Sequence, residues 1–219
     1  MSEQLATLPA IPIYLVHYVE EQPNSSEWDK LPYVQLVDVV TGETPALQTF
    51  VRVCWSRYGL HVQFRCDDDV IVSPYTKRDD PLYDADVVEW FIDPGTSDNS
   101  YYEFNISPHN VVFDSKIINT PNKPRSFHPE WNAAGLTSEV RYVQPNRQQG
   151  GSGSVQIEYT AMLPFADLQA CPQPGDEWTL NLFRIDQNTA GERRYYAWSP
   201  TGAVQFHVPD RFGRIRFYK

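Results

Sequence analysis

A run of polar residues leads directly into an apolar segment near the middle of the chain. The stretch RDDPLYDADVVEWFIDP, residues 78–94, places Glu89 between Val88 and Trp90. A carboxylate in this position can accept hydrogen bonds from a ligand, or it can move a proton in a reaction. Glycoside hydrolysis, for example, requires two carboxyl groups roughly 5–10 Å apart. The carboxylates that could supply such a pair are Asp84, Asp86, Glu89 and Glu103.

The alternation of side chains along a β-strand predicts which way these carboxylates point. In DVVEWFID, Val88, Trp90 and Ile92 fall on one face, whereas Glu89 and Phe91 fall on the other. In YYEFNIS the residues Tyr101, Glu103 and Asn105 share a face. A hairpin through DPGTSDNS places Glu89 beside Asn105 on one sheet face, which we expect to be exposed. A carboxylate next to an amide suits the hydroxyl groups of a neutral polar ligand. The solvated face of a half-buried sheet explains the same pattern without a ligand.

Most of the chain consists of short apolar and aromatic segments bounded by Gly, Pro, Asn or Asp. This pattern predicts strands at the spacing of a sandwich or barrel. The predicted fold is therefore all-β: an antiparallel two-sheet β-sandwich, immunoglobulin-like or jelly-roll-like, with little helix. The predicted strands are TFVRVCWS, GLHVQFRCDD, DVVEWFIDP, YYEFNISP, NVVFDSKI, TSEVRYV, SVQIEYTAML, EWTLNLFRID, RYYAWSP and FGRIRFYK.

The composition predicts a single domain. A chain of 219 residues with 41% hydrophobic and 14% aromatic residues can bury one sizeable core. We therefore expect one domain over residues 1–219, with residues 1–45 packing on it as an N-terminal segment. The segment PFADLQA, residues 164–170, predicts one short helix that begins at Pro164. The segment RQQGGSGS, residues 147–154, predicts a flexible hairpin loop.

The charge balance excludes some classes of partner. With 18 basic and 28 acidic residues the net charge is −10, which argues against nucleic acid or an anionic membrane surface. No apolar run approaches the length of about 18 residues that a membrane-spanning helix needs. The start of the sequence shows no basic region followed by a long apolar one, so we expect no signal peptide. The sequence as given then predicts a cytoplasmic protein, and a preceding leader would make it extracellular.

The cysteines and histidines predict neither a disulfide framework nor a zinc site. Three cysteines cannot all pair within one chain. If Val51–Trp55 and Leu60–Cys66 form a hairpin, alternation puts Cys54 and Cys66 on opposite faces, where they cannot bridge. The third cysteine is Cys171. We therefore expect three free thiols. The histidines show no zinc-ligand spacing.

Several segments occur in an order that resembles one known family from about residue 50 to the end of the chain. They are VRVCWSRYGLHVQFRCDDDVI, RDDPLYDADVVEWFIDP, YYEFNIS, VQIEYTAMLPFADL, WTLNLFRID, AWSP and HVPDRFGRIRF. The chain is similar to the family 9 carbohydrate-binding modules and their family-9-like relatives. The resemblance implies an antiparallel β-sandwich that binds carbohydrate without catalysis.

The resemblance also implies a sugar slot between two aromatic rings, with polar side chains below. Tyr83 and Phe206 stand at or near the positions of the family's two tryptophans, and both rings can still stack on a sugar. Glu89 occupies the position of the binding-site glutamate. Asn105 stands where sugar-binding members carry an arginine, and an amide cannot replace a guanidinium's fork of donors. The predicted ligand-binding set is completed by Tyr101 and Asp86.

The resemblance further implies a cofactor and partners. Family members often hold structural calcium, for which Asp67, Asp69 and Asp114 are the candidate ligands. The expected partner is a mono-, oligo- or polysaccharide in carbohydrate catabolism, as for modules associated with xylanases, and any glycoside hydrolase would be a separate polypeptide. Two alternatives stay open: a glycoside hydrolase-type enzyme with paired carboxylates, and a sandwich that binds haem, with Met162 as an axial ligand, or another small ligand.

Overall fold

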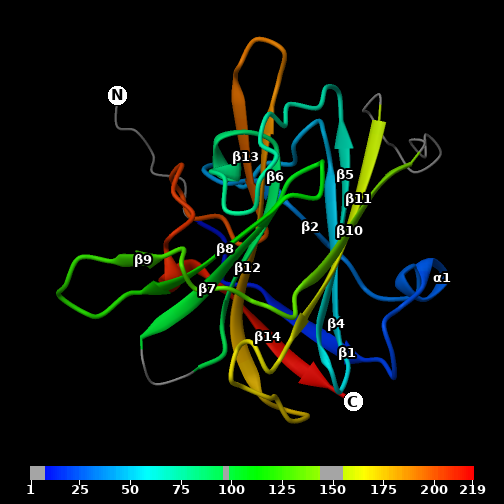
Figure 1. Cartoon of the computed structure of the whole chain (residues 1–219), viewed down its shortest axis with the longest axis vertical. Coiled ribbons are helices and arrows are strands. Elements are labelled where there is room, and N and C mark those ends of the chain that lie inside the picture. Colours follow the sequence, from blue (N-terminus) through cyan, green and yellow to red (C-terminus); the bar gives the residue numbers. More distant parts are fainter. Residues whose placement is uncertain (1–7, 96–98, 144–154) are drawn as a thin grey trace.

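The computed structural model describes residues 8–95, 99–143 and 155–219, and the regular secondary structure in this part of the chain is almost entirely β-strand (Figure 1). The strands are β1 (Ile13–Tyr18), β2 (Val34–Gln35), β3 (Val37–Asp38), β4 (Thr49–Trp55), β5 (Gly59–Asp68), β6 (Val87–Asp93), β7 (Ser100–Ile106), β8 (Val112–Ile118), β9 (Ser126–His128), β10 (Thr137–Val143), β11 (Val155–Pro164), β12 (Glu177–Gln187), β13 (Arg193–Ala197) and β14 (Gly213–Tyr218). The helical elements are α1 (Ser25–Trp28) and the 3₁₀ turns η1 (Leu82–Asp84) and η3 (Pro209–Arg211).

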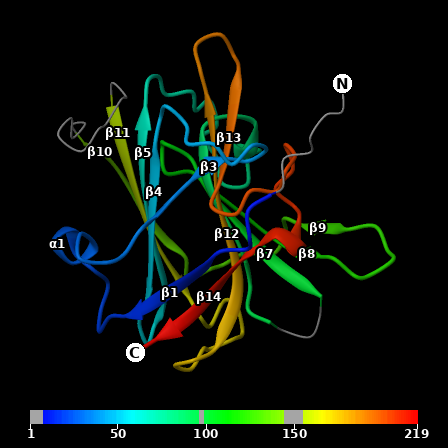
Figure 2. The ribbon, with the colours of Figure 1, turned by 180° about the vertical axis from the view of Figure 1, so that it is seen from behind.

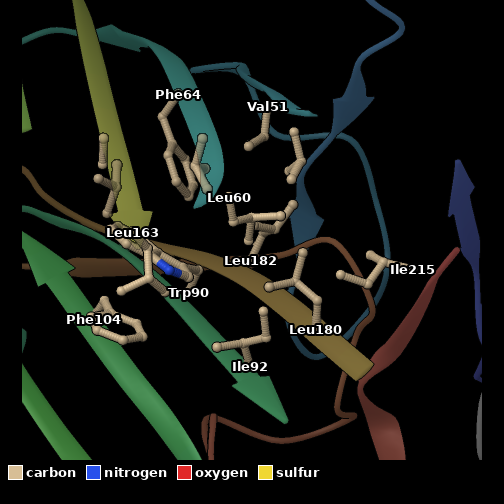
Figure 3. Close-up of a cluster of buried hydrophobic side chains, with 14 of the residues drawn as sticks. Val51, Leu60, Phe64, Trp90, Ile92, Phe104, Leu163, Leu180, Leu182 and Ile215 are labelled. Atoms are coloured by element: carbon tan, nitrogen blue, oxygen red, sulfur yellow. The ribbon is translucent and has the colours of Figure 1, made fainter. Parts of the chain in front are cut away.

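The strands form two layers that share one hydrogen-bonded path. One layer has the order β10-β11-β5-β4, the other has the order β12-β6-β7-β8-β9, and β1 and β14 connect them. Large apolar side chains fill the space between the layers, and Phe64 of β5 lies 6.4 Å from Trp90 of β6 between ring centroids. Figure 3 shows side chains from both layers meeting in this core. The prediction of an all-β sandwich is confirmed.

The N-terminal segment contributes a strand that the sequence analysis did not predict. Strand β1 lies between β14 and β4 and runs parallel to both, whereas the other strand pairs in the described part of the chain are antiparallel. Figure 2 shows β1 and β14 side by side where the two layers join. The N-terminal segment therefore belongs to the sheet, and the predicted antiparallel sandwich is mixed at this junction.

The alternation predicted for β6 and β7 is confirmed. Trp90 of β6 and Phe104 of β7 enter the inner core. Glu89 pairs with Asn105 across the ladder on the opposite, outer face, which also carries Phe91. The expected exposure of this face was wrong, because Glu89 is only 1% exposed. A second apolar cluster covers the face, and it includes Phe206 and Phe212 from the C-terminal segment. Because the covering segment is so distant in the sequence, the residues of β6 alone do not predict that this face is buried.

The predicted helix over residues 164–170 is wrong. Strand β11 continues to Pro164, and turns follow it. Gln169 has a φ of 52°, in the left-handed region that interrupts a helix. The observed α-helix, α1, begins after Asn24, whose side chain accepts hydrogen bonds from two backbone amides while Glu27 binds back to the Asn24 amide. This capping box was visible in the sequence as NSSE.

The cysteine prediction agrees with the structure. Cys66 pairs with Thr49 across the β4–β5 ladder and Cys54 pairs with His61, so the two cysteines point to opposite faces. Cys54, Cys66 and the exposed Cys171 are all free thiols. The predicted loop over residues 147–154 lies outside the described residues. Among the described residues, no helix is long and apolar enough to cross a membrane.

Candidate functional site

A pocket of about 550 Å³ opens on the outer face of the β12-β6-β7-β8 layer. The second apolar cluster forms its base, because odd-numbered residues of β6 and β7 point to this side of the sheet. The C-terminal segment over residues 204–207 forms part of its wall. The lining residues are Tyr83, Glu89, Phe91, Glu103, Phe113, Ser115, Phe127, Pro129, Ile185, Tyr195, Val204, Gln205, Phe206 and His207.

Two glutamates supply the charge on the pocket floor. Glu89 pairs with Asn105 in the β6–β7 ladder, and Glu103 precedes Asn105 by two residues, so the carboxylates are diagonal neighbours on one face. Both are buried, and Glu89 Oε1 has no hydrogen-bond partner among the residues that the structure describes. Glu103 Oε1 accepts a hydrogen bond of 3.0 Å from Asn105 Nδ2. The floor therefore offers acceptors that are only partly used.

Burial changes the protonation of these glutamates. It raises the pKa of Glu89 well above its usual range, and the neighbouring Glu103 charge raises it further. Burial also raises the pKa of Glu103, to about 7, while the hydrogen bond from Asn105 acts in the opposite direction. Burial thus favours the protonated form of Glu89, and Glu103 is partly ionised at neutral pH. The floor can donate as well as accept hydrogen bonds.

His207 is a site residue that the sequence analysis did not select. Its Nδ1 lies 2.9 Å from Tyr101 Oη, its Nε2 lies 3.8 Å from Glu103 Oε2, and its ring stacks on Phe91 with centroids 4.8 Å apart. Burial, followed by the charge of Arg125, lowers the pKa of His207 to about 4, so the ring is neutral at neutral pH. When Tyr101 donates its hydroxyl proton to Nδ1, the ring hydrogen is on Nε2, which lies toward Glu103. The sequence did not indicate His207, because no other histidine or cysteine lies at a suitable metal-ligand spacing from it.

Aromatic side chains form the rim and walls of the pocket. Tyr83 is 45% exposed and packs edge-on against Phe113. Phe127 is 51% exposed and packs edge-on against His207. Both rings can therefore meet a ligand. Phe127 was missed because β9 has only three residues and gives no strand pattern.

Phe206, the predicted second ring of the slot, lies in the wall of the pocket. Phe206 lines the pocket, but it is only 9% exposed and stacks flat on Phe183, with centroids 4.1 Å apart and planes 10° apart. Tyr195 packs against its edge. Since Phe183 covers one face of Phe206, this ring forms part of the wall, and Phe127 is the exposed ring in this region.

The remaining predicted ligand-binding residues lie behind the pocket or away from it. Asn105 and Tyr101 are fully buried and contact Glu103 and His207, which line the pocket themselves. Asp86 accepts hydrogen bonds from the backbone amides of Val72 and Gln187 at 2.5 and 2.7 Å. Asp86 thus ties the loop before β6 to the end of β12, which is a structural role.

The predicted calcium ligands have other partners in this structure. Asp67 accepts a hydrogen bond from Gln156, and Asp114 pairs with Arg78 at 2.5 Å. Within the described ranges, no three side chains of the His, Cys, Asp or Glu types come together as a metal site would require. Calcium at Asp67, Asp69 and Asp114 stays a prediction, and it would need backbone carbonyls or water to complete its coordination.

The proposed haem ligand lies on the other layer. Met162 belongs to β11, where its neighbours Ala161 and Leu163 enter the inner core. Alternation therefore directs Met162 away from the space between the sheets. Large aromatic and aliphatic side chains already fill that space, which argues against a haem between the layers.

The sequence matches the family described as carbohydrate family 9 binding domain-like over residues 23–219. The chain belongs to this family. It is 26% identical over 226 residues to a protein of Arthroderma benhamiae named "Extracellular protein", and the match covers 97% of both chains.

Solved structures share the fold of this family 9-like domain. One is a candidate carbohydrate-binding protein from Bacteroides uniformis, with a TM-score of 0.73, 15% identity, and coverage of 95% of this chain and 100% of that one. Another is a family 9 carbohydrate-binding module from Caldicellulosiruptor kristjanssonii in complex with cellotriose, with a TM-score of 0.64, 13% identity, and coverage of 94% and 93%. The same organism's family 9 module in complex with glucose gives a TM-score of 0.63 at 12% identity, with coverage of 94% and 95%.

Proposed function

We propose that the outer-face pocket binds carbohydrate without modifying it. The observation that carries this proposal is the combination of exposed aromatic rings at the rim with buried carboxyl groups on the floor. Sugar rings have apolar C–H faces that stack on aromatic side chains, and hydroxyl edges that both donate and accept hydrogen bonds. Family membership supports the same function.

The pocket has suitable groups for both parts of a sugar. Tyr83 and Phe127 supply the ring faces for stacking. The protonated Glu89 can donate through its carboxyl hydrogen and accept through its other oxygen, while Glu103 accepts. The neutral His207 adds a ring nitrogen on the same side. The ligand therefore replaces water at groups that the chain leaves only partly hydrogen-bonded.

A glycoside hydrolase is the second candidate, because a carboxyl group with a pKa near 7 beside a protonated one resembles an acid–base pair. The geometry argues against it. In such enzymes the two carboxyl groups flank the scissile bond, whereas Glu89 and Glu103 project from adjacent strands on the same sheet face. Both would approach a bound sugar from one side. Release of an aromatic alcohol from aryl glycosides, abolished in Glu103→Gln, would favour catalysis instead.

The wider role follows from non-catalytic binding. We propose that the protein acts in polysaccharide or oligosaccharide catabolism by holding carbohydrate for a glycoside hydrolase on a separate polypeptide. Co-purification with such an enzyme in the presence of its polysaccharide, lost in the variant Phe127→Ala, would support this role. If the enzyme co-purifies equally well with Phe127→Ala, its contact with this protein lies on another surface.

A glycan-binding screen followed by calorimetry tests the proposal. The screen is run with calcium and with a chelator, which tests the calcium prediction at the same time. For the best glycan we expect an affinity on the order of micromolar to millimolar. Tyr83→Ala and Phe127→Ala each weaken binding by about 1–2 kcal/mol, since each removes a stacking face. Tyr58→Ala, at a similarly exposed tyrosine in the β4–β5 turn, is the matched control. Equal binding by all four proteins would place the site elsewhere.

A further inference from the structure

The pocket floor contains buried acidic groups that the described residues leave without a positive partner. Glu89 is 1% exposed, and its Oε1 is unpartnered although it lines a cavity. Glu103 contacts the neutral amide of Asn105 and the neutral ring of His207. None of the lining residues is a lysine or an arginine. A buried carboxyl group in this state is held in its proton-bound form until a cation arrives.

The walls of the same pocket suit a cation as well. Aromatic ring faces attract ammonium groups through the negative potential above the ring, and the attraction grows when the cation is desolvated. Tyr83, Phe91, Phe113, Phe127 and Phe206 all line the pocket. In such a site one ammonium group can contact the aromatic ring faces and pair with the carboxyl groups at the same time.

We propose that this pocket selects a sugar that carries a protonated amino group over the corresponding neutral sugar. The inference rests on the proposed carbohydrate-binding function and names the class of sugar. The ammonium group donates hydrogen bonds to Glu89 and Glu103, and the apolar face of the sugar ring stacks at the rim. A 2-amino-2-deoxy sugar places the ammonium group beside the ring, within the reach of one pocket.

Binding of such a sugar requires a proton to leave the floor. The ammonium group pairs with a carboxylate, so at mildly acidic pH one proton that the pair Glu89 and Glu103 holds in the free protein passes to the buffer. The other titratable groups around the floor do not take it up. Burial raises the pKa of Tyr83 and Tyr101, which stay protonated, and lowers the pKa of His207 to about 4, which stays neutral. Tyr195, Tyr75 and the charges of Arg125 and Asp84 also lie around the pocket. A neutral sugar needs no such release.

Three trisaccharides with the same β-1,4 skeleton isolate the amino group. Cellotriose has a hydroxyl group at each C2, fully deacetylated chitotriose has an amine, and N-acetylchitotriose has a neutral amide. In calorimetry at mildly acidic pH, we expect the deacetylated trimer to bind at least about tenfold more tightly than cellotriose, since charge-assisted hydrogen bonds replace neutral ones. We also expect its heat, and not that of cellotriose, to vary with the ionisation enthalpy of the buffer.

Two variants distinguish the pocket from the general negative charge of the protein. Glu89→Gln keeps the shape of the neutral acid but cannot become a carboxylate. It should lose most of the preference for the amine, so its affinity for the deacetylated trimer should fall much further than its affinity for cellotriose. Glu158→Gln, at a buried glutamate that pairs with Arg65 on the other layer, should leave both affinities unchanged.

The three trimers distinguish a failure of the amine preference from a failure of carbohydrate binding, on which the preference rests. Equal affinity for cellotriose and the deacetylated trimer overturns the amine preference and leaves carbohydrate binding intact. A preference that persists in Glu89→Gln also overturns it, because the attraction then comes from the surface as a whole. If none of the three trimers binds and the wider screen finds no sugar, both the inference and the proposed function fail.

Discussion

The Arg184 cluster and the pocket floor both bury carboxylates on the β12-β6-β7 side of the molecule, and they differ in what neutralises these carboxylates. Arg184 lies on the inner face and bridges the two layers. It donates to Asp68 at 3.0 Å, to Asp186 at 2.6 Å, and to the backbone oxygen of Asp67 at 2.6 Å. On the outer face, the described surroundings of Glu89 and Glu103 offer only neutral donors.

This difference separates a structural cluster from a binding site. A buried ion pair with its hydrogen bonds complete fixes the geometry of the fold, and losing one partner leaves an uncompensated charge. A buried carboxyl group without a partner lowers stability, so its presence in a cavity suggests that a ligand completes it. The same residue type thus has two roles, which are distinguished by the partners around it and by access to solvent.

The largest expected effect is at the Arg184 cluster. Arg184→Met leaves Asp68 buried without its guanidinium partner and leaves Asp186 with Arg194 alone, and it should lower the free energy of unfolding by about 3–5 kcal/mol. Urea denaturation followed by tryptophan fluorescence measures this change. Arg193→Met removes a half-exposed pair with Asp84 and should cost only about 0–1 kcal/mol. Similar losses in the free energy of unfolding for the two variants would show that the Arg184 cluster stabilises the fold no more than a half-exposed ion pair does.

Titration of Glu103 on the pocket floor should make the stability of the protein depend on pH. Burial raises the folded-state pKa of Glu103 from 4.5 to about 7, so the folded protein binds this proton more tightly than the unfolded chain. The resulting stability is fully present below about pH 4.5 and is lost as the pH rises toward about 7. Glu103→Gln abolishes this titration, and its free energy of unfolding should fall less across that window, by on the order of 3 kcal/mol.

Denaturation curves at several pH values provide this test for the floor. Glu20→Gln, at an exposed carboxylate, is the control and should follow the wild-type profile. A profile for Glu103→Gln that matches wild type would mean that Glu103 has an ordinary pKa in the folded protein, and the contrast with the Arg184 cluster would disappear.

The smallest expected effect concerns the amide that supports Glu103. The hydrogen bond from Asn105 lowers the pKa of Glu103 against the effect of burial. Asn105→Leu keeps much of the side-chain volume and removes the donor, so the pKa of Glu103 should rise by about one unit, or about 1.4 kcal/mol. Titration of the Glu103 carboxyl signal by NMR measures the shift. An unchanged pKa would leave Asn105 with a packing role alone.

Strands with strong alternation were predictable from the sequence, often to the residue. The bounds of β5 and β10 agree with the segments GLHVQFRCDD and TSEVRYV, because side-chain alternation and turn residues are local properties. The register of Glu89 against Asn105 followed from the same alternation. Local patterns therefore placed the two strands that carry the floor.

The features that could not be predicted from the sequence depend on contacts between distant segments. The burial of Glu89 requires the C-terminal segment around Phe206 to cover the outer face. His207 and Phe127 reach the pocket from a loop and a three-residue strand, where no periodicity exists to reveal them. The parallel pairing of β1 likewise depends on where β14 ends, more than 190 residues later.

NMR titration of the side-chain carboxyl groups, with and without the best-binding glycan, tests most directly the claim that the floor is completed by a ligand. We expect Glu89 and Glu103 in the free protein to titrate above the usual range for glutamate. We also expect both signals to shift when the glycan is added, while the signals of Asp68 and Asp186 stay in place. Ordinary titration of both glutamates, or glycan binding that leaves their signals unmoved, would contradict that claim.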